Sequence, residues 1–530
     1  MNVSHTALTP LAFLERSARV WPDKTAIVHG DTRVGYAEFA ARTTRVARAL
    51  RASGVGPGDR VAYLMPNVPE LLVAHFAVPL AEGVLVAINT RLSGEEIAYI
   101  CAHSAARLLV VDEALLGSVT AMPAGAADGL QIVVAGDGER PPGAITYDEL
   151  TARGTDEPLP WTVEDETAPI SINYTSGTTG RPKGVIYTHR GAYLNSFGEI
   201  VHSAHDRNSV YLWTLPMFHC NGWCTPWAVT GIGGTHVCLR EVRGDAIWRL
   251  IREHGVTHLN GAPTVLTTIM NAPEAAPLDR PITVTTAGAP PSPTTIGGME
   301  RLGFAIVHVY GLTETYGPYS VCEPQPGWPD LDPAERATRL ARQGVGMLQA
   351  ETMRVVDENM NDVPADGATM GEIVMRGNNV MAGYHDDPEG TAQAFRGGWF
   401  HSGDLGVLHP DGYVELRDRA KDVIVSGGEN ISTIEVEQAI MSHPAVLEVS
   451  VVGVPDEKWG ERPKAFVIRK EGAEVTGEAL IEHVQAKIAR YKAPREVEFL
   501  DALPKTSTGK IQKFALRERE WTHKDTRIQG

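Results

Sequence analysis

Cysteine is scarce in this sequence, which has only five in 530 residues, at positions 101, 220, 224, 238 and 322. A secreted disulfide framework would need a denser and even-numbered set, so we expect a reducing, cytoplasmic setting. No stretch approaches 18 uninterrupted apolar residues, so integral membrane association is not expected. The first residues, MNVSHTALTPLAF, also lack the basic and apolar regions of a signal peptide.

Positive charge is in deficit as well. The formal net charge is -17, and no basic tract is visible. Because nucleic-acid binding requires a positive stripe that neutralises phosphates, we expect no nucleic-acid partner and favour small-molecule partners instead. Hydrophobic residues make up 43% and charged residues 21%, as in globular proteins. The length predicts at least two domains.

Short β-rich runs alternate with helical patterns over most of the chain. This alternation predicts βαβ units and a largely parallel sheet covered by helices. The candidate strands are residues 60–64, 83–88, 108–111, 131–134, 170–174, 236–239 and 306–310.

The pattern changes near residue 344, where short strands separated by Asp-Gly turns predict a β-rich subdomain over about 344–418. A compact α+β pattern follows. It comprises a helix at 433–442, strands at 446–454 and 464–469, and a helix at 477–489 that the RYKAP run ends. We therefore predict an α/β protein with an N-terminal domain over residues 1–418, a boundary at 419–421 and a small α+β C-terminal domain over 422–530.

The most informative segment is YTSGTTGRPKG, residues 174–184, directly after an apolar strand candidate. Its glycines allow a tight turn whose amide groups converge on an anion, while hydroxyls and one lysine supply further donors. The spacing is not that of a Walker A loop. The predicted phosphate-binding residues are Thr175, Ser176, Gly177, Thr178, Thr179, Gly180 and Lys183.

This segment resembles the phosphate-binding signature of the adenylate-forming superfamily, which comprises acyl-CoA synthetases, peptide-synthetase adenylation domains and luciferases. Each further motif is weak alone, but six in the family's order over essentially the whole chain are specific. They are AGAPPS (287–292), YGLTE (310–314), SGD (402–404), RAKD (419–422), GGEN (427–430) and PKTSTGK (504–510).

The resemblance implies a nucleotide site. Small residues let the flat adenine approach the backbone, and an aromatic ring stacks on it. Asp404 resembles the ribose-binding carboxylate, and Glu314 resembles the Mg²⁺ contact, with Thr178 and Thr313 beside the phosphates. The other residues implied in nucleotide binding are Gly288, Ala289, Pro290, Tyr310, Gly311, Leu312, Leu416 and Arg419.

Lys510 resembles the family's lysine that bridges the substrate carboxylate and the α-phosphate. Because a carboxylate attacking a phosphate brings two anions together, a positioned ammonium stabilises the transition state. Lys421 matches the hinge about which the C-terminal domain rotates. Gly427 and Gly428 would then leave room for the pantetheine arm of coenzyme A.

Of all parts of the site, the pocket for the acid is the one that the sequence indicates least clearly. MFHCNGWCTPW, residues 217–227, resembles the segment beside the carboxylate, with His219 as its foremost lining residue. Trp223, Trp227, His308 and Gly311 are further candidates. The segment suggests a zinc site only superficially, and its two cysteines fit small apolar core residues better. No charged partner for a second carboxylate is evident, so we expect a medium-chain, aromatic or cyclic apolar acid, with acetate a poor substrate.

The sequence therefore predicts an acyl-CoA ligase that uses ATP, Mg²⁺ and coenzyme A. A ligase loading a carrier protein is the nearest alternative, although we expect no carrier-type domain after Gly530. A luciferase-like monooxygenase and a nucleotide-binding homologue that performs only one half-reaction also remain open. A homodimer is considered as the assembly.

Overall fold

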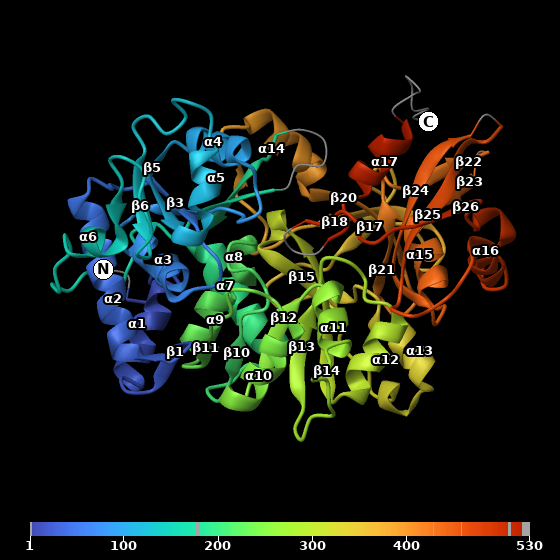
Figure 1. The fold of residues 1–530 in the computed structure, drawn as a ribbon, viewed down its shortest axis with the longest axis horizontal. Coiled ribbons are helices and arrows are strands. Elements are labelled where there is room, and N and C mark those ends of the chain that lie inside the picture. Colours follow the sequence, from blue (N-terminus) through green and yellow to red (C-terminus); the bar gives the residue numbers. More distant parts are fainter. Residues whose placement is uncertain (1–2, 176–180, 428, 457, 507–509, 522–530) are drawn as a thin grey trace.

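The computed structural model describes residues 3–175, 181–427, 429–456, 458–506 and 510–521. It has a large N-terminal domain with mostly parallel sheets and a smaller α+β domain at its C-terminal end, so the predicted α/β class is confirmed (Figure 1). Across the described residues, no helix combines the length and apolarity that a membrane crossing would require.

One sheet of the N-terminal domain has the order β19-β9-β8-β4-β3-β5-β6-β7. The central pairs are parallel, whereas β8–β9 and β9–β19 are antiparallel. Its strands are β3 (Arg60–Leu64), β4 (Val84–Ala87), β5 (Ala106–Asp112), β6 (Gln131–Ala135), β7 (Ile145–Thr146), β8 (Pro169–Tyr174), β9 (Gly184–Thr188) and β19 (Gly383–Tyr384). The helices between or beside them are α2 (Tyr36–Ala52), α3 (Pro69–Leu80), α4 (Gly94–His103), α5 (Leu116–Thr120), α6 (Tyr147–Thr151) and α14 (Pro388–Ala394).

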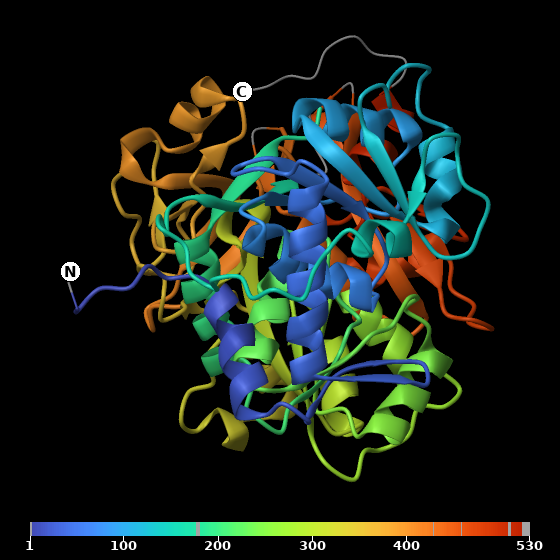
Figure 2. The ribbon, with the colours of Figure 1, turned by 90° about the vertical axis from the view of Figure 1, so that its left-hand side faces the viewer.

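The second large sheet has the order β16-β15-β14-β13-β12-β10-β11-β1-β2. Its strands are β1 (Thr25–His29), β2 (Thr32–Gly35), β10 (Val210–Leu212), β11 (Thr235–Val237), β12 (His258–Gly261), β13 (Ile282–Thr286), β14 (Phe304–Leu312), β15 (Gly317–Val321) and β16 (Val345–Gly346). Its helices are α1 (Leu11–Val20), α7 (His189–His202), α8 (Cys220–Trp223), α9 (Thr225–Gly231), α10 (Gly244–His254), α11 (Pro263–Met270), α12 (Pro293–Arg301) and α13 (Pro333–Leu340). Figure 2 shows the blue N-terminal helices in front of the sheets.

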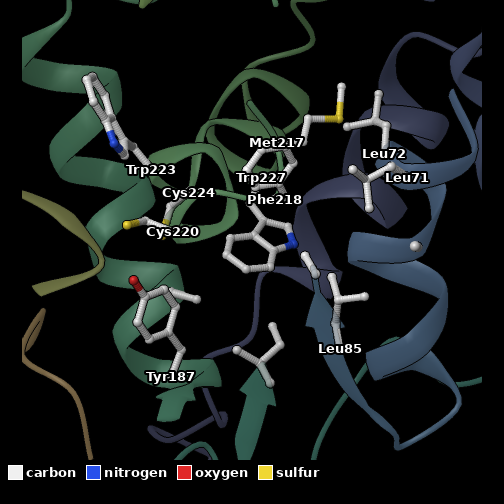
Figure 3. Packing of buried hydrophobic residues seen from close by; sticks show 14 of the residues in the cluster. Leu71, Leu72, Leu85, Tyr187, Met217, Phe218, Cys220, Trp223, Cys224 and Trp227 are labelled. Atoms are coloured by element: carbon white, nitrogen blue, oxygen red, sulfur yellow. The ribbon is translucent and has the colours of Figure 1, made fainter. Parts of the chain in front are cut away.

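A single hydrophobic cluster joins the two large sheets. Leu71 and Leu72 of α3 pack there with Trp227 of α9, as Figure 3 shows. The Trp227 ring is fully buried, and its indole N–H donates to the carbonyl of His75 (3.0 Å). Trp227 therefore packs in the core between the sheets, and Trp223, which is also buried, belongs to the same cluster. All five cysteines are buried and free.

The C-terminal third contains the two smaller sheets. The β-rich subdomain is an antiparallel sheet of β17 (Arg354–Val356), β18 (Met370–Met375), β20 (Phe400–Leu408) and β21 (Val414–Arg419). The C-terminal domain contains β22 (Ile424–Ser426), β23 (Glu429–Ile431), α15 (Thr433–Met441), β24 (Val446–Asp456), β25 (Gly460–Arg469), α16 (Gly477–Gln485), β26 (Glu496–Phe499) and α17 (Lys513–Trp521).

Most predicted strands lie within two residues of the observed ones, but the helix predicted over 477–489 was wrong at its end. α16 ends at Gln485, and just after it the N–H of Lys487 bonds to the carbonyl of Val484, three residues back (2.9 Å), as in a 3₁₀ turn. This tight turn brings Ile488 onto the core of the C-terminal domain. The helix therefore ends before the proline of the RYKAP run can stop it.

Glu199 on α7 is an unusual buried residue. Its side chain is 0% exposed, and among the described residues neither carboxylate oxygen has a hydrogen-bond partner. Burial raises the pKa of Glu199 to about 8. The folded protein therefore holds a proton here that the unfolded chain releases above its ordinary value of 4.5.

This burial predicts a pH-dependent stability. The stabilising contribution of protonated Glu199 is complete below the unfolded pKa and is lost as pH rises towards about 8, with a slope of at most about 1.4 kcal/mol per pH unit. Glu199→Gln should remove that slope, so its melting temperature should exceed that of the wild type increasingly between pH 5 and 8. Exposed Glu253→Gln is the control. Parallel curves for Glu199→Gln and the wild type would contradict the assignment.

Candidate active site

Two strands carry the ends of the predicted phosphate-binding loop. β8 and β9 are antiparallel neighbours, and just beyond them the N–H of Thr175 donates to the carbonyl of Lys183 (3.0 Å). This hydrogen bond therefore joins the two ends of the predicted loop. The predicted residues Ser176, Gly177, Thr178, Thr179 and Gly180 lie outside the described residues.

The ammonium of Lys183 is held by residues that the sequence analysis missed. Its Nζ lies 3.2 Å from Asp387 Oδ2 and 4.4 Å from the ring centroid of Tyr384. The Tyr384 hydroxyl donates to Glu314 Oε1 (2.9 Å), so one tyrosine joins the loop lysine to the predicted Mg²⁺ ligand. The run GYHDDPEG carried the signal, but a surface turn explains such a run equally well.

Thr313 and Glu314 follow β14, where the chain turns back into β15. The hydroxyl of Tyr187 donates to the carbonyl of Thr313 (2.6 Å), and the N–H of Met381 donates to that of Glu314 (2.8 Å). The turn requires Gly311, because a β-carbon there would lie 1.9 Å from the carbonyl oxygen of Gly317. Burial raises the pKa of Glu314, so its charge is poorly compensated by the protein alone.

Asp404 of β20 links the predicted nucleoside contacts. Its Oδ2 accepts a hydrogen bond from the Tyr310 hydroxyl (2.7 Å), and its Oδ1 lies 3.3 Å from Arg419 Nε. Asp404 and Arg419 are direct partners in the β20–β21 ladder, and Asp404 is 3% exposed. Leu416 lies on the same strand as Arg419 and packs against the core.

The predicted adenine surface lies at the carboxyl end of β13. Gly288 and Ala289 are exposed there, and Pro290 is half-buried. Gly288 has a φ of +92°, and a β-carbon added to it would meet only Ala262, at 4.0 Å. Carboxyl ends of parallel strands are where such sheets bind ligands, and these small residues leave the surface accessible to a flat ring.

Lys510 reaches this site from the C-terminal domain. Burial lowers its pKa to about 7, and the neighbouring charge of Arg419 adds to this while Asp404 opposes it. His219, from the acid segment, has a pKa lowered to about 4 by burial and then by Lys510. The charge of Lys510 is therefore felt by His219 of the acid segment, and Lys510 in turn feels the charges of Arg419 and Asp404. Its loop also contacts the N-terminal domain, because Arg91 donates to the carbonyl of Thr506 (3.3 Å).

The acid segment contains a left-handed turn. Residues 220–224 all have positive φ, between 48° and 63°, although only Gly222 is glycine. Such a conformation costs about 1–2 kcal/mol per non-glycine residue, so its surroundings must impose it. Buried Asn221 supplies one strut, since its Oδ1 accepts from Ser171 (2.6 Å) and Asn173 (2.7 Å).

This turn separates the two tryptophans of the segment. Figure 3 shows the ring of Trp223 on the opposite side of the segment from Trp227. A β-carbon added to Gly317 would lie 2.5 Å from Trp223 Cδ1, so the side chain of Trp223 packs closely against the start of β15. His308 has a partner elsewhere, since its Nδ1 lies 3.2 Å from the carbonyl oxygen of Leu340, the last residue of α13.

The predicted hinge and coenzyme A residues lie at the start of the C-terminal domain. Lys421 follows β21, and its carbonyl accepts a hydrogen bond from Arg517 of α17 (2.8 Å). Gly427 has a φ of +62°, and a β-carbon there would lie 2.5 Å from the Trp459 ring. Glycine is therefore required at this position. Gly428 lies outside the described residues.

Comparison with known proteins agrees with this arrangement. The family model described as "AMP-binding enzyme" matches residues 14–385, and "AMP-binding enzyme C-terminal domain" matches residues 435–510. An acetate–CoA ligase of Humulus lupulus is 46% identical over 97% of this chain and 95% of its own length. A 4-hydroxybutyrate–CoA ligase of Metallosphaera sedula is 44% identical over 97% of this chain and 94% of its own length.

Solved structures give the same result. An anthranilate CoA ligase in complex with anthranoyl-AMP has a TM-score of 0.86 at 25% identity and covers 98% of both chains. A benzoate CoA ligase of Burkholderia xenovorans has a TM-score of 0.84 at 27% identity, over 96% of this chain and 100% of its own. The chain belongs to the AMP-binding enzyme family, and within it to the AMP-forming acid–thiol ligases that make acyl-CoA from a carboxylic acid, ATP and coenzyme A.

Proposed function

We propose which residues of this acyl-CoA ligase act in each of its two half-reactions. In the first, a carboxylate oxygen attacks the α-phosphorus of ATP, the bond to the bridging oxygen breaks, and pyrophosphate leaves. In the second, the sulfur of coenzyme A attacks the acyl carbon, the carbon–oxygen bond to the phosphate breaks, and AMP leaves. The convergence of Lys510 with Arg419, Asp404 and His219 is the observation that carries this assignment.

The nucleotide contacts follow from chemistry at each position. Asp404 accepts hydrogen bonds from the ribose hydroxyls, in place of its present hydrogen bond from Tyr310 or its ion pair with Arg419. Adenine lies on the exposed backbone at Gly288 with the Tyr310 ring beside it. The phosphates lie between Lys183 and Thr313. The remaining contacts are Thr175, Ser176, Gly177, Thr178, Thr179, Gly180, Ala289, Pro290, Gly311, Leu312 and Leu416.

Glu314 is the proposed Mg²⁺ ligand. Burial raises the pKa of its carboxylate, and a divalent cation nearby would lower that pKa again. Carboxylate oxygens are also the hard ligands that Mg²⁺ prefers. When bound, the ion would neutralise phosphate charge. Tyr384 orients this carboxylate through its hydrogen bond to Oε1. Lys183 exchanges its present partner Asp387 for the phosphates of ATP.

Lys510 is the proposed catalytic group of the first half-reaction. A cation between the nucleoside residues and the acid segment stabilises negative charge as the carboxylate meets the α-phosphate. The second half-reaction then uses another arrangement of the C-terminal domain (422–530), reached by rotation about residues 419–421 with Lys421 as the pivot. Gly427 and Gly428 line the path of the pantetheine arm in that arrangement.

The acid is proposed to be an apolar monocarboxylic acid of short to medium length. The sequence led us to expect a medium-chain, aromatic or cyclic acid, with acetate a poor substrate. Because relatives are named for acetate, 4-hydroxybutyrate, 2-methylpropanoate and trans-cinnamate, we revise that expectation and add acetate to the candidates. His219, Gly311 and Trp223 line the proposed pocket, and His308 is retained only as a distant candidate. Coenzyme A, not a carrier protein, is the proposed acceptor. A cytoplasmic homodimer is proposed as the working form, although some relatives are named as peroxisomal.

Replacing the catalytic ammonium should separate the two half-reactions. Lys510→Ala should lower adenylation by roughly 30-fold to several thousand-fold, which corresponds to about 2–5 kcal/mol for a lost charge-assisted contact. Thioester formation from a supplied acyl-adenylate should be spared. Pyrophosphate exchange and thioester release measure the two steps. Equal losses in both would show that Lys510 has another role, and full activity in both would remove it from the reaction.

Acid selectivity should depend on the wall formed by Trp223. Trp223→Ala should shift the optimum towards longer or bulkier acids, in graded steps of about 1–3 kcal/mol per methylene. The measurement is kcat/KM for a C2–C12 series and benzoate-like acids, with a melting curve for each variant. Trp227→Phe, a change in the core, is the control and should leave the order of acids unchanged. An unshifted optimum in a well-folded Trp223→Ala variant would contradict the wall.

A further inference from the structure

A buried carboxylate connects the two sides of the proposed hinge. Asp418 is the residue before the last one of β21, and it pairs with Leu405 in the β20–β21 ladder. The backbone of Asp418 is therefore fixed to the β-rich subdomain, on the N-terminal side of residues 419–421. Its side chain is nevertheless 2% exposed and points to the C-terminal domain.

The donors to this carboxylate come from the start of α15. Asp418 Oδ2 accepts a hydrogen bond from the backbone N–H of Thr433 (2.6 Å) and a second from its hydroxyl (2.8 Å). The neighbouring hydroxyl of Ser432 donates to the carbonyl of Arg417. α15 itself is packed into the core of the C-terminal domain through Val436. These bonds therefore join one domain to the other.

The same threonine is also connected to the segment that carries the catalytic lysine. Lys513 Nζ donates to the Thr433 hydroxyl and lies 2.8 Å from Glu437 Oε1. Lys513 is the first residue of α17 and follows Lys510 by three positions. The chain of contacts from Asp418 through Thr433 to Lys513 thus runs from the strand of Arg419 to the base of the Lys510 loop.

We propose that Asp418, Thr433 and Lys513 form a bridge that holds the C-terminal domain in the arrangement where Lys510 meets the nucleotide. The bridge crosses the hinge, so a rotation there must separate Thr433 from Asp418. Asp418 Oδ2 would then lose both of its donors, while Oδ1 keeps the backbone N–H of Arg419 (2.8 Å). A buried carboxylate oxygen without donors needs water or new partners, which makes leaving this arrangement costly. The bridge thereby favours adenylation over thioester formation. This inference rests on the proposed alternation of the C-terminal domain.

The contacts at the hinge itself are of a different kind. Arg517 of α17 donates to the carbonyl of Lys421 and pairs with Asp422, and both of these residues lie at or after the pivot. They fix the peptide after Lys421 to the C-terminal domain, so rotation is confined to the torsions of Lys421 and the residues before it. The Arg517 contacts can persist through the rotation, whereas those of Thr433 with Asp418 cannot.

Position 433 offers a clean test, because it is the first residue of a helix. Proline is favoured there, and Ser432 already has the extended conformation (φ -71°, ψ 123°) that a following proline requires. Thr433→Pro removes both donors to Asp418 while it leaves the helix intact. Thr433→Ser keeps both donors and serves as the matched control. Thr433→Val keeps only the backbone N–H and should have an intermediate effect.

The measurement is the ratio of two rates in the full-length enzyme: pyrophosphate exchange, and thioester formation from supplied acyl-adenylate. Thr433→Pro should lower the ratio by roughly 10- to 100-fold, through slower exchange with unchanged or faster thioester formation. Thr433→Ser should keep the wild-type ratio. An unchanged ratio in both Thr433→Pro and Thr433→Val, or an equal loss in Thr433→Ser, would overturn the bridge. If Thr433→Pro does not fold, as a melting curve would reveal, the ratio for Thr433→Val alone decides.

Failure of the alternation itself would look different. Lys421→Pro fixes φ at the pivot and should block thioester formation while sparing adenylation. If Lys421→Pro forms the thioester at the wild-type rate, the domains do not alternate about this residue. Both the hinge and the bridge are then refuted. If Lys421→Pro blocks that step but the Thr433 variants keep the wild-type ratio, the hinge stands and only the bridge is refuted.

Discussion

The burial of the Lys510 ammonium beside a second cation, Arg419, is the interaction on which the rest of the site depends. Burial and Arg419 together lower the pKa of Lys510 to about 7, with Asp404 and Asp422 as the nearby compensating charges. The protein alone therefore compensates the positive charge of Lys510 only in part. This ammonium is suited to a site that receives anions, as its proposed role requires, because adenylation brings a carboxylate and a triphosphate together.

The fold brings this cation to the site from a great distance in sequence. Strands β14, β20 and β21 supply Tyr310, Asp404 and Arg419, and the β9–β19 pair brings Lys183 and Tyr384 next to Glu314. The Lys510 loop completes the site from the C-terminal domain. Because one side of the site belongs to a separate domain, its geometry depends on how that domain is held. The contacts of Asp418 and Lys513 therefore matter as much as the contacts at the nucleotide.

Local sequence patterns predicted the parts that local physics determines. The apolar run 60–64 became β3, and the glycine and hydroxyl pattern at 174–184 was predicted to follow a strand, which is β8. The resemblance to a family then supplied Asp404, Glu314 and Lys510, which composition alone could not have distinguished from ordinary surface charges.

What the sequence could not predict depends on tertiary contacts. A left-handed turn at residues 220–224 contradicts the preferences of four of its five residues, and it decides that Trp223 and Trp227 face opposite sides. Buried Asn221 imposes it through partners some 50 residues away. Tyr384 and Asp418 were missed for a similar reason, since their importance depends on partners brought together only by the fold.

The central claim, that a poorly compensated ammonium at position 510 drives adenylation, is tested most directly by the pH dependence of kcat/KM for ATP in pyrophosphate exchange. This constant reports the pKa of the free enzyme. For the wild type it should fall as pH rises above about 7, because Lys510 loses its proton. Lys510→Arg keeps its charge and should be slower but level through about pH 9. The same descending limb in both enzymes would contradict the account.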